Sequence, residues 1–137
     1  MGQMSQDVDL AWSLFCSGDK ASLNEAWRIA TAVADDVARS ASERAEALFL
    51  LGQLARFLQP WRSSDEGFGY FERAIAIEPG HIDSLLAMCE LHLKRSPVSG
   101  ADIDKVMAQV EKARSSMSSE NVRQLECIVA NRSKVHG

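Results

Sequence analysis

Apolar residues recur along this chain at the three- and four-residue spacing of amphipathic helices, and the alternation typical of strands is nearly absent. The chain also has few β-branched runs and no Asn-Gly or Asp-Gly hairpin pair. The pattern therefore predicts an all-α protein. The expected helices cover about 5–17, 22–39, 42–58, 64–78, 82–95, 100–117 and 120–133.

Capping boxes mark several of these helix starts, because a Ser side chain accepts a backbone N–H bond and a carboxylate three residues later reaches back. The pairs that fit are Ser22 with Glu25, Ser40 with Glu43, Ser63 with Glu66, and Ser99 with Asp102. Helix breakers lie between the apolar segments at Gly18, Pro60, Pro79-Gly80 and Pro97. Short connections of this kind predict that consecutive helices pack as antiparallel neighbours.

The apolar pattern also repeats along the chain as three helix pairs followed by one further helix. The equivalent positions in the first helices of the pairs include Trp12, Leu48 and Leu85, and also Cys16, Gly52 and Cys89. We interpret the second set as a column of small residues at a close helix crossing. In the second helix of the middle pair, Phe71 is expected to pack on the first helix, while Gly67 and Ala74 let the two helices approach.

These residues resemble the tetratricopeptide repeat (TPR) family, whose unit has a W-x2-L-G-x2-Y pattern followed by A-x3-F-x2-A-x4-P. The matching residues of the middle unit are Leu48, Leu51, Gly52, Gly67, Phe71, Ala74 and Pro79. The flanking units match less completely. The resemblance implies a single TPR-like domain over 1–137 that forms a short right-handed superhelix, with repeats at about 9–39, 42–79 and 82–117 and a capping helix at about 120–133.

Composition narrows the function further. The chain has 137 residues, 46% of them apolar, and a net charge of -4 with basic and acidic residues interspersed. This distribution disfavours nucleic acid as a partner. The longest apolar run, 47–51, is too short to span a bilayer, so no membrane association is expected. Three widely separated cysteines favour a reducing, cytoplasmic location over a disulfide framework.

Candidate chemistry is sparse. Cys16 and Cys89 fall in the small-residue column, and Cys127 is expected to be a buried small apolar residue rather than a nucleophile. His81, His92 and His136 have no metal-ligand spacing. Adjacent carboxylates such as Asp35 and Asp36 are typical of helix ends and solvated faces. We therefore expect no enzyme, no metal and no cofactor.

The TPR resemblance implies that the first helix of each pair lines a concave groove for a peptide or helix of another protein. The positions that it assigns to the groove are Glu46, Phe49, Gln53, Arg56 and Phe57 in the middle unit, and Asp83, Leu86, Glu90, Leu93 and Lys94 in the third. Phe49, Phe57 and Leu86 are the expected apolar anchors, with Arg56 and Glu90 setting orientation. Alternatively, the protein's own termini fill this groove.

Two other functions remain open from the sequence. Small proteins with three TPR-like repeats include chaperones of type III secretion substrates, so that role is one alternative by analogy of fold. A self-associating scaffold is the other, because the apolar residues of 120–133 are suited either to capping the array or to joining two chains as a homodimer.

Overall fold

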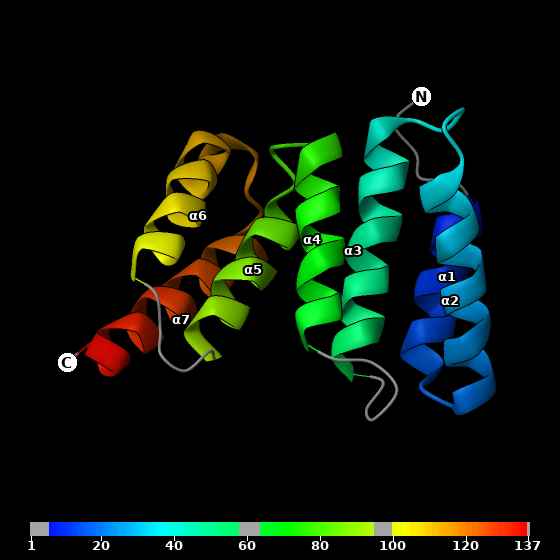
Figure 1. The fold of residues 1–137 in the computed structure, drawn as a ribbon, viewed down its shortest axis with the longest axis horizontal. Coiled ribbons are helices and arrows are strands. Elements are labelled where there is room, and N and C mark those ends of the chain that lie inside the picture. The colour runs from blue at the N-terminus through cyan, green and yellow to red at the C-terminus, as the bar shows by residue number, and fades with distance from the viewer. Residues whose placement is uncertain (1–5, 58–63, 95–99, 137) are drawn as a thin grey trace. The chain divides into compact units, whose positions relative to one another are not determined.

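The computed structural model describes residues 6–57, 64–94 and 100–136 (Figure 1). Over these ranges the protein is all-helical, without a strand, which confirms the predicted fold class. The helices are α1 (Gln6–Ser17), α2 (Lys20–Asp35), α3 (Ala41–Phe57), α4 (Ser64–Ile77), α5 (Ile82–Lys94), α6 (Gly100–Lys112) and α7 (Ser119–His136), with a 3-10 turn, η1, at Arg114–Ser116.

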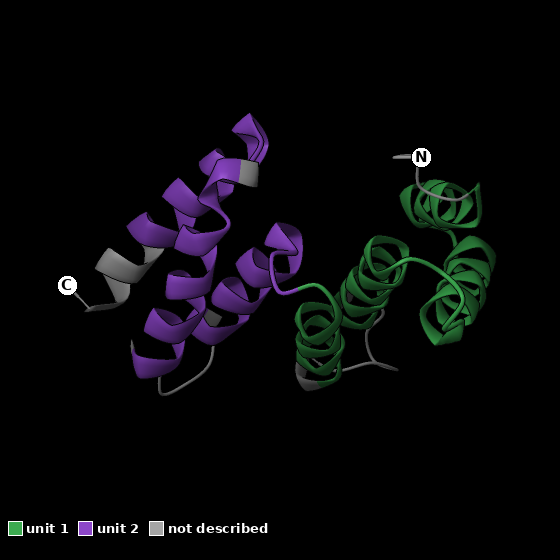
Figure 2. Ribbon diagram, turned by 90° about the horizontal axis from the view of Figure 1, so that it is seen from above, with its two compact units in different colours: residues 1–78 green, residues 79–137 purple. Residues whose placement is uncertain are grey.

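The chain divides into two compact units, residues 1–78 and residues 79–137 (Figure 2). The first unit contains α1 to α4, and the second contains α5 to α7. The consecutive helices α1 and α2, α3 and α4, and α5 and α6 pack against each other, as the helix-pair pattern predicts. The expectation that 1–137 forms a single domain stays a prediction.

Helix α3 is the centre of the first unit, because it packs against α1, α2 and α4. Its crossing with α4 is close: a Cβ atom placed on Gly67 would lie 3.0 Å from the carbonyl oxygen of Gly52. The ring of Phe71, which is fully buried, covers Gly52. The expected roles of Gly52, Gly67 and Phe71 in the middle pair are therefore confirmed.

Helix α5 holds the second unit together, because both α6 and α7 pack against it. The Cys89 thiol, fully buried on α5, lies 3.8 Å from the Met107 sulfur on α6. On the α7 side, the Asn121 amide donates a 3.0 Å hydrogen bond to Asp83. The core of the unit is completed by buried apolar residues of α6 and α7, among them Ile103, Val110, Leu125 and Ile128.

The start of α2 differs from the prediction. Gly18, with a φ of 76°, ends the preceding turn, and Asp19 rather than Ser22 is the N-cap. Asp19 accepts hydrogen bonds from the Ser22 hydroxyl at 2.7 Å and from the Ser22 backbone N–H at 3.0 Å. These bonds, the hydroxyl bond first, lower the pKa of Asp19. The predicted N-cap at Ser22 is therefore wrong, because Asp19 already caps a helix that begins at Lys20.

Three helix ends also differ. Helix α2 ends at Asp35, short of the predicted 39, because the Asp36 carboxylate accepts from the Ala38 N–H and bends the chain. Helix α6 ends at Lys112 instead of 117 and is followed by η1. Helix α7 runs to His136, beyond the predicted 133.

Of the predicted capping boxes, the one at Ser40 is confirmed in its first half: the Glu43 N–H donates to the Ser40 hydroxyl at 3.2 Å, while the Glu43 carboxylate accepts from that hydroxyl at 3.4 Å. The pairs that begin at Ser63 and Ser99 lie outside the described residues. A reciprocal box that the prediction missed begins α7, where Ser118 and Asn121 each accept the backbone N–H of the other. Asn121 performs the role for which only a carboxylate had been considered.

Candidate functional site

Four of the predicted groove residues on α3 form one stripe along the helix. Glu46, Phe49, Gln53 and Arg56 stand at i, i+3, i+7 and i+10, which places them on one face. Glu46 accepts a 3.1 Å hydrogen bond from the Trp12 indole N–H, so this end of the stripe borders α1. At the other end, Arg56 donates to the Gln53 side-chain oxygen at 3.1 Å. The polar members of the stripe are half-buried; Gln53 and Arg56 bond to each other, and Glu46 bonds to Trp12.

Phe49 differs from the expected exposed anchor, because only 8% of it is exposed. Its ring lies between Trp12, with centroids 5.8 Å apart, and Phe71, at 5.7 Å. These two rings come from α1 and α4, so Phe49 connects three helices of the first unit. Its side chain therefore contributes to the core of the unit, with little area left for a partner.

Trp12 on α1, rather than Phe49, is the partly exposed aromatic residue beside the stripe. The indole is half-buried, and its edge also meets Phe15 at a centroid distance of 5.7 Å. Trp12 had been identified only as the counterpart of Leu48 and Leu85 in the repeat. The size of its side chain is the sequence feature that could have identified Trp12 as a surface residue, because tryptophan is rarely buried completely.

The remaining predicted groove residues give a mixed result. Phe57 ends α3, and its side chain lies outside what the structure describes. Leu86 is 1% exposed and belongs to the core, whereas Glu90 and Leu93 are half-buried on the same helix, α5. The α3 residues lie in the first compact unit and the α5 residues in the second. Each set is therefore a separate candidate surface.

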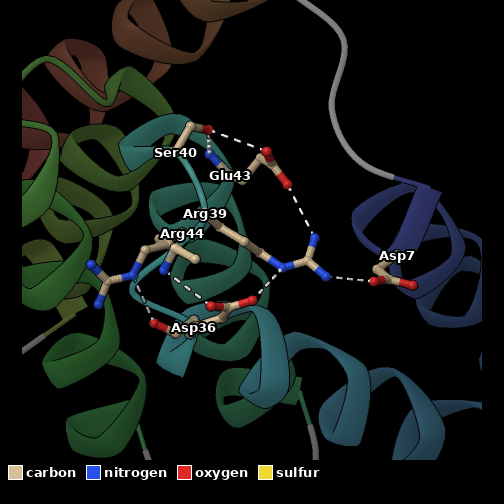
Figure 3. A network of polar contacts seen from close by, with 8 residues as sticks. Asp7, Asp36, Arg39, Ser40, Glu43 and Arg44 are labelled. Carbon is tan, nitrogen blue, oxygen red and sulfur yellow. Dashed lines mark hydrogen bonds and ion pairs between the residues drawn. The ribbon is translucent and has the colours of Figure 1, made fainter.

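An ion-pair network fixes α1 beside α3 (Figure 3). Arg39 donates to Asp7 on α1 at 2.7 Å and to Glu43 on α3 at 3.2 Å, and its Nε lies 3.4 Å from an Asp36 oxygen. The hydrogen bond to Asp7, followed by that to Glu43, raises the pKa of Arg39. One cation thus joins both helices and the turn between α2 and α3.

Arg44 joins α3 to the end of α2, because its Nε donates a 3.0 Å hydrogen bond to the Ala34 carbonyl in the last turn of α2 (Figure 3). The carbonyl groups in the last turn of a helix lack partners within the helix, so this bond satisfies one of them. Two arginines therefore position the helices from which Trp12 and the α3 stripe project.

Two cysteine predictions are wrong. Cys16 and Cys127 are exposed, whereas Cys89 is buried as expected. Cys16 lies in the last turn of α1, whose buried residues are Val8 and Ala11. Cys127 shares α7 with the buried Leu125 and Ile128 but points away from the face that packs on α5.

The described residues contain no group of three or more His, Cys, Asp or Glu side chains able to hold a metal ion. His81 is buried at the start of α5, with its Nδ1 2.8 Å from the Ser84 hydroxyl. Among the helices that the structure describes, none has both the length and the apolar character needed to cross a membrane.

Comparisons with models of protein families, with curated proteins and with solved structures returned no match to this chain. The resemblance to the tetratricopeptide repeat family therefore stays a prediction, based on the residues of the middle helix pair.

Proposed function

We propose that the protein is a non-enzymatic interaction module that binds a peptide or helix of another protein. The binding surface in the first unit is the face shared by α1 and α3, which consists of Trp12, Glu46, Gln53 and Arg56. In the second unit, Glu90 and Leu93 form a separate candidate contact surface. The right-handed superhelix implied by the TPR resemblance belongs to the same proposal.

The Trp12–Glu46 hydrogen bond is the observation that carries this proposal. It joins two helices at a half-buried tryptophan and holds the indole in one orientation beside polar side chains. Tryptophan and arginine are enriched among residues that contribute most to protein–protein binding, and a fixed side chain loses little entropy when a partner docks. The proposed surface is thus preorganised, with Phe49 supporting it from beneath.

A charge reversal tests this surface. With the purified protein immobilised and exposed to lysate of its native cells, Arg56→Glu is expected to weaken retention of the specific partner by on the order of tenfold, because it opposes the charge that orients the partner. Arg28→Glu is the matched control, since Arg28 is an exposed arginine on α2, away from the α1–α3 face.

Melting temperatures of both variants check that the fold is retained. Equal retention by wild type, Arg56→Glu and Arg28→Glu would exclude the α1–α3 face as the binding surface.

A further inference from the structure

The outer surface of α4 carries a hollow that the proposed α1–α3 face does not include. It has a volume of about 310 Å³ and is lined by Glu66, Gly69, Tyr70 and Arg73. These residues stand at i, i+3, i+4 and i+7. Four residues at this spacing form the hole that receives one side chain of a facing helix in knobs-into-holes packing. Every helix face offers this spacing, and here Gly69 leaves room within it for an inserted side chain.

Gly69 forms the floor of this hollow. A Cβ atom placed on it would meet no heavy atom of the described residues within 4 Å, in contrast to the crowded surroundings of Gly52 and Gly67 on the same helix pair. Packing within the chain thus explains Gly52 and Gly67 but leaves Gly69 unexplained. A glycine inside a helix is unfavourable relative to alanine, and here it leaves open space where another side chain can enter.

Contacts within the first unit hold the Tyr70 and Arg73 side chains that line the hollow. The Tyr70 ring meets Trp27 of α2 edge-on, with centroids 5.6 Å apart, and the Arg73 guanidinium lies 5.7 Å from the Tyr70 centroid. Arg73 also lies 3.8 Å from an Asp35 oxygen, while its side chain remains 54% exposed. Tyrosine and arginine are residue types enriched at the centres of protein interfaces.

The charges at the two ends of the hollow specify the partner. Glu66 and Arg73 are seven residues apart, about 10.5 Å along the helix axis. A helix lying along α4 therefore faces a negative charge at one end and a positive charge at the other, with an apolar floor between them. Opposite charges on the partner would match both ends.

We propose that this hollow docks a helix of another protein, which inserts one large apolar side chain over Gly69. The docked helix carries a basic residue facing Glu66 and an acidic residue facing Arg73, seven positions apart. The site lies on the α2–α4 side of the first unit, so it is independent of binding at the α1–α3 face.

A synthetic helical peptide tests the proposal directly. The probe is an alanine-rich peptide of about 18 residues with Lys, Leu and Glu at i, i+4 and i+7. It is titrated into the isotopically labelled full-length chain and followed by amide chemical shifts. We expect saturable shifts at residues 66–73 at millimolar peptide. The peptide in which Ala replaces this Leu should bind at least about tenfold more weakly, since it lacks the apolar side chain that fills the hollow.

Variants of the protein separate docking from stability. Gly69→Leu places an apolar side chain in the hollow and should raise the dissociation constant of the probe at least about tenfold, whereas Gly69→Ala should change it less than about threefold. Both variants should unfold at a denaturant concentration at least as high as wild type. Arg73→Glu should weaken the Lys-Leu-Glu probe and favour a Lys-Leu-Lys peptide.

Three outcomes of the peptide titrations would overturn the proposal: no saturable shifts with the wild-type protein, equal binding by Gly69→Leu and wild type, or shifts located outside α4. Concentration-dependent shifts at 66–73 in the protein alone would also overturn it, because they would identify a second copy of the chain as the occupant.

Discussion

Replacing Gly52 with Leu should lower the free energy of unfolding by roughly 1 to 3 kcal/mol or more, because the site has no room for a side chain. A Cβ atom on Gly52 would stand 2.8 Å from Cζ of Phe71 and closer still to two other atoms of that ring. Phe71 is itself fully buried, and its ring centroid lies 5.7 Å from that of Phe49, so displacing it disturbs the aromatic cluster. The added side chain therefore forces α3 and α4 apart.

Denaturant unfolding followed by circular dichroism measures this effect. Gly69→Leu is the matched control, since it makes the same substitution on α4 at a position with no neighbour within 4 Å. If Gly52→Leu unfolds at the same denaturant concentration as Gly69→Leu, the close α3–α4 crossing described here is incorrect.

The second large effect is expected from Phe49→Ala, which should cost roughly 3 kcal/mol or more of stability. The reason is the position of the ring between Trp12 and Phe71, where its removal leaves a cavity among three helices. This expectation revises the initial assignment of Phe49 as an exposed anchor whose loss would spare the fold. Unfolding curves of Phe49→Ala and of Phe15→Ala, a half-buried ring at the edge of the same cluster, provide the comparison.

Partner binding distinguishes the two roles of Phe49. If the ring is structural, affinity per folded molecule should remain within about threefold of wild type. A Phe49→Ala protein that keeps wild-type stability but loses its partner would restore Phe49 as a direct contact and contradict the packing described here.

The fold class and the close helix pair were predictable because their signals are local or periodic. The Ser40 box marks the start of α3 within four residues, and the Gly52 and Phe71 positions follow from a repeat that recurs along the chain. The end of α2 was harder to predict. The end of α2 depends on the Asp36 side chain, which accepts a backbone hydrogen bond. It also depends on Arg39, which binds the carboxylates of Asp7 on α1 and Glu43 on α3.

The candidate site was predicted only in part, since exposure depends on residues distant in sequence. The stripe of Glu46, Gln53 and Arg56 follows from helical spacing alone. The burial of Phe49 does not, because Trp12 and Phe71 cover it from other helices. The hollow over Gly69 was missed for a related reason: a small residue in a helix indicates either a close crossing or an open surface, and only the surrounding side chains distinguish the two.

Hydroxyl-radical footprinting of the protein with its partner shows whether the α1–α3 face is the binding surface, because it reports the exposure of individual side chains. We expect oxidation of Trp12 to fall several-fold in the complex, since a partner on the α1–α3 face covers the indole. Val37, which is 82% exposed in the turn between α2 and α3, is the internal control and should be oxidised equally in both states. Trp12 oxidation at the same rate in the free protein and in the complex would contradict the proposed binding face.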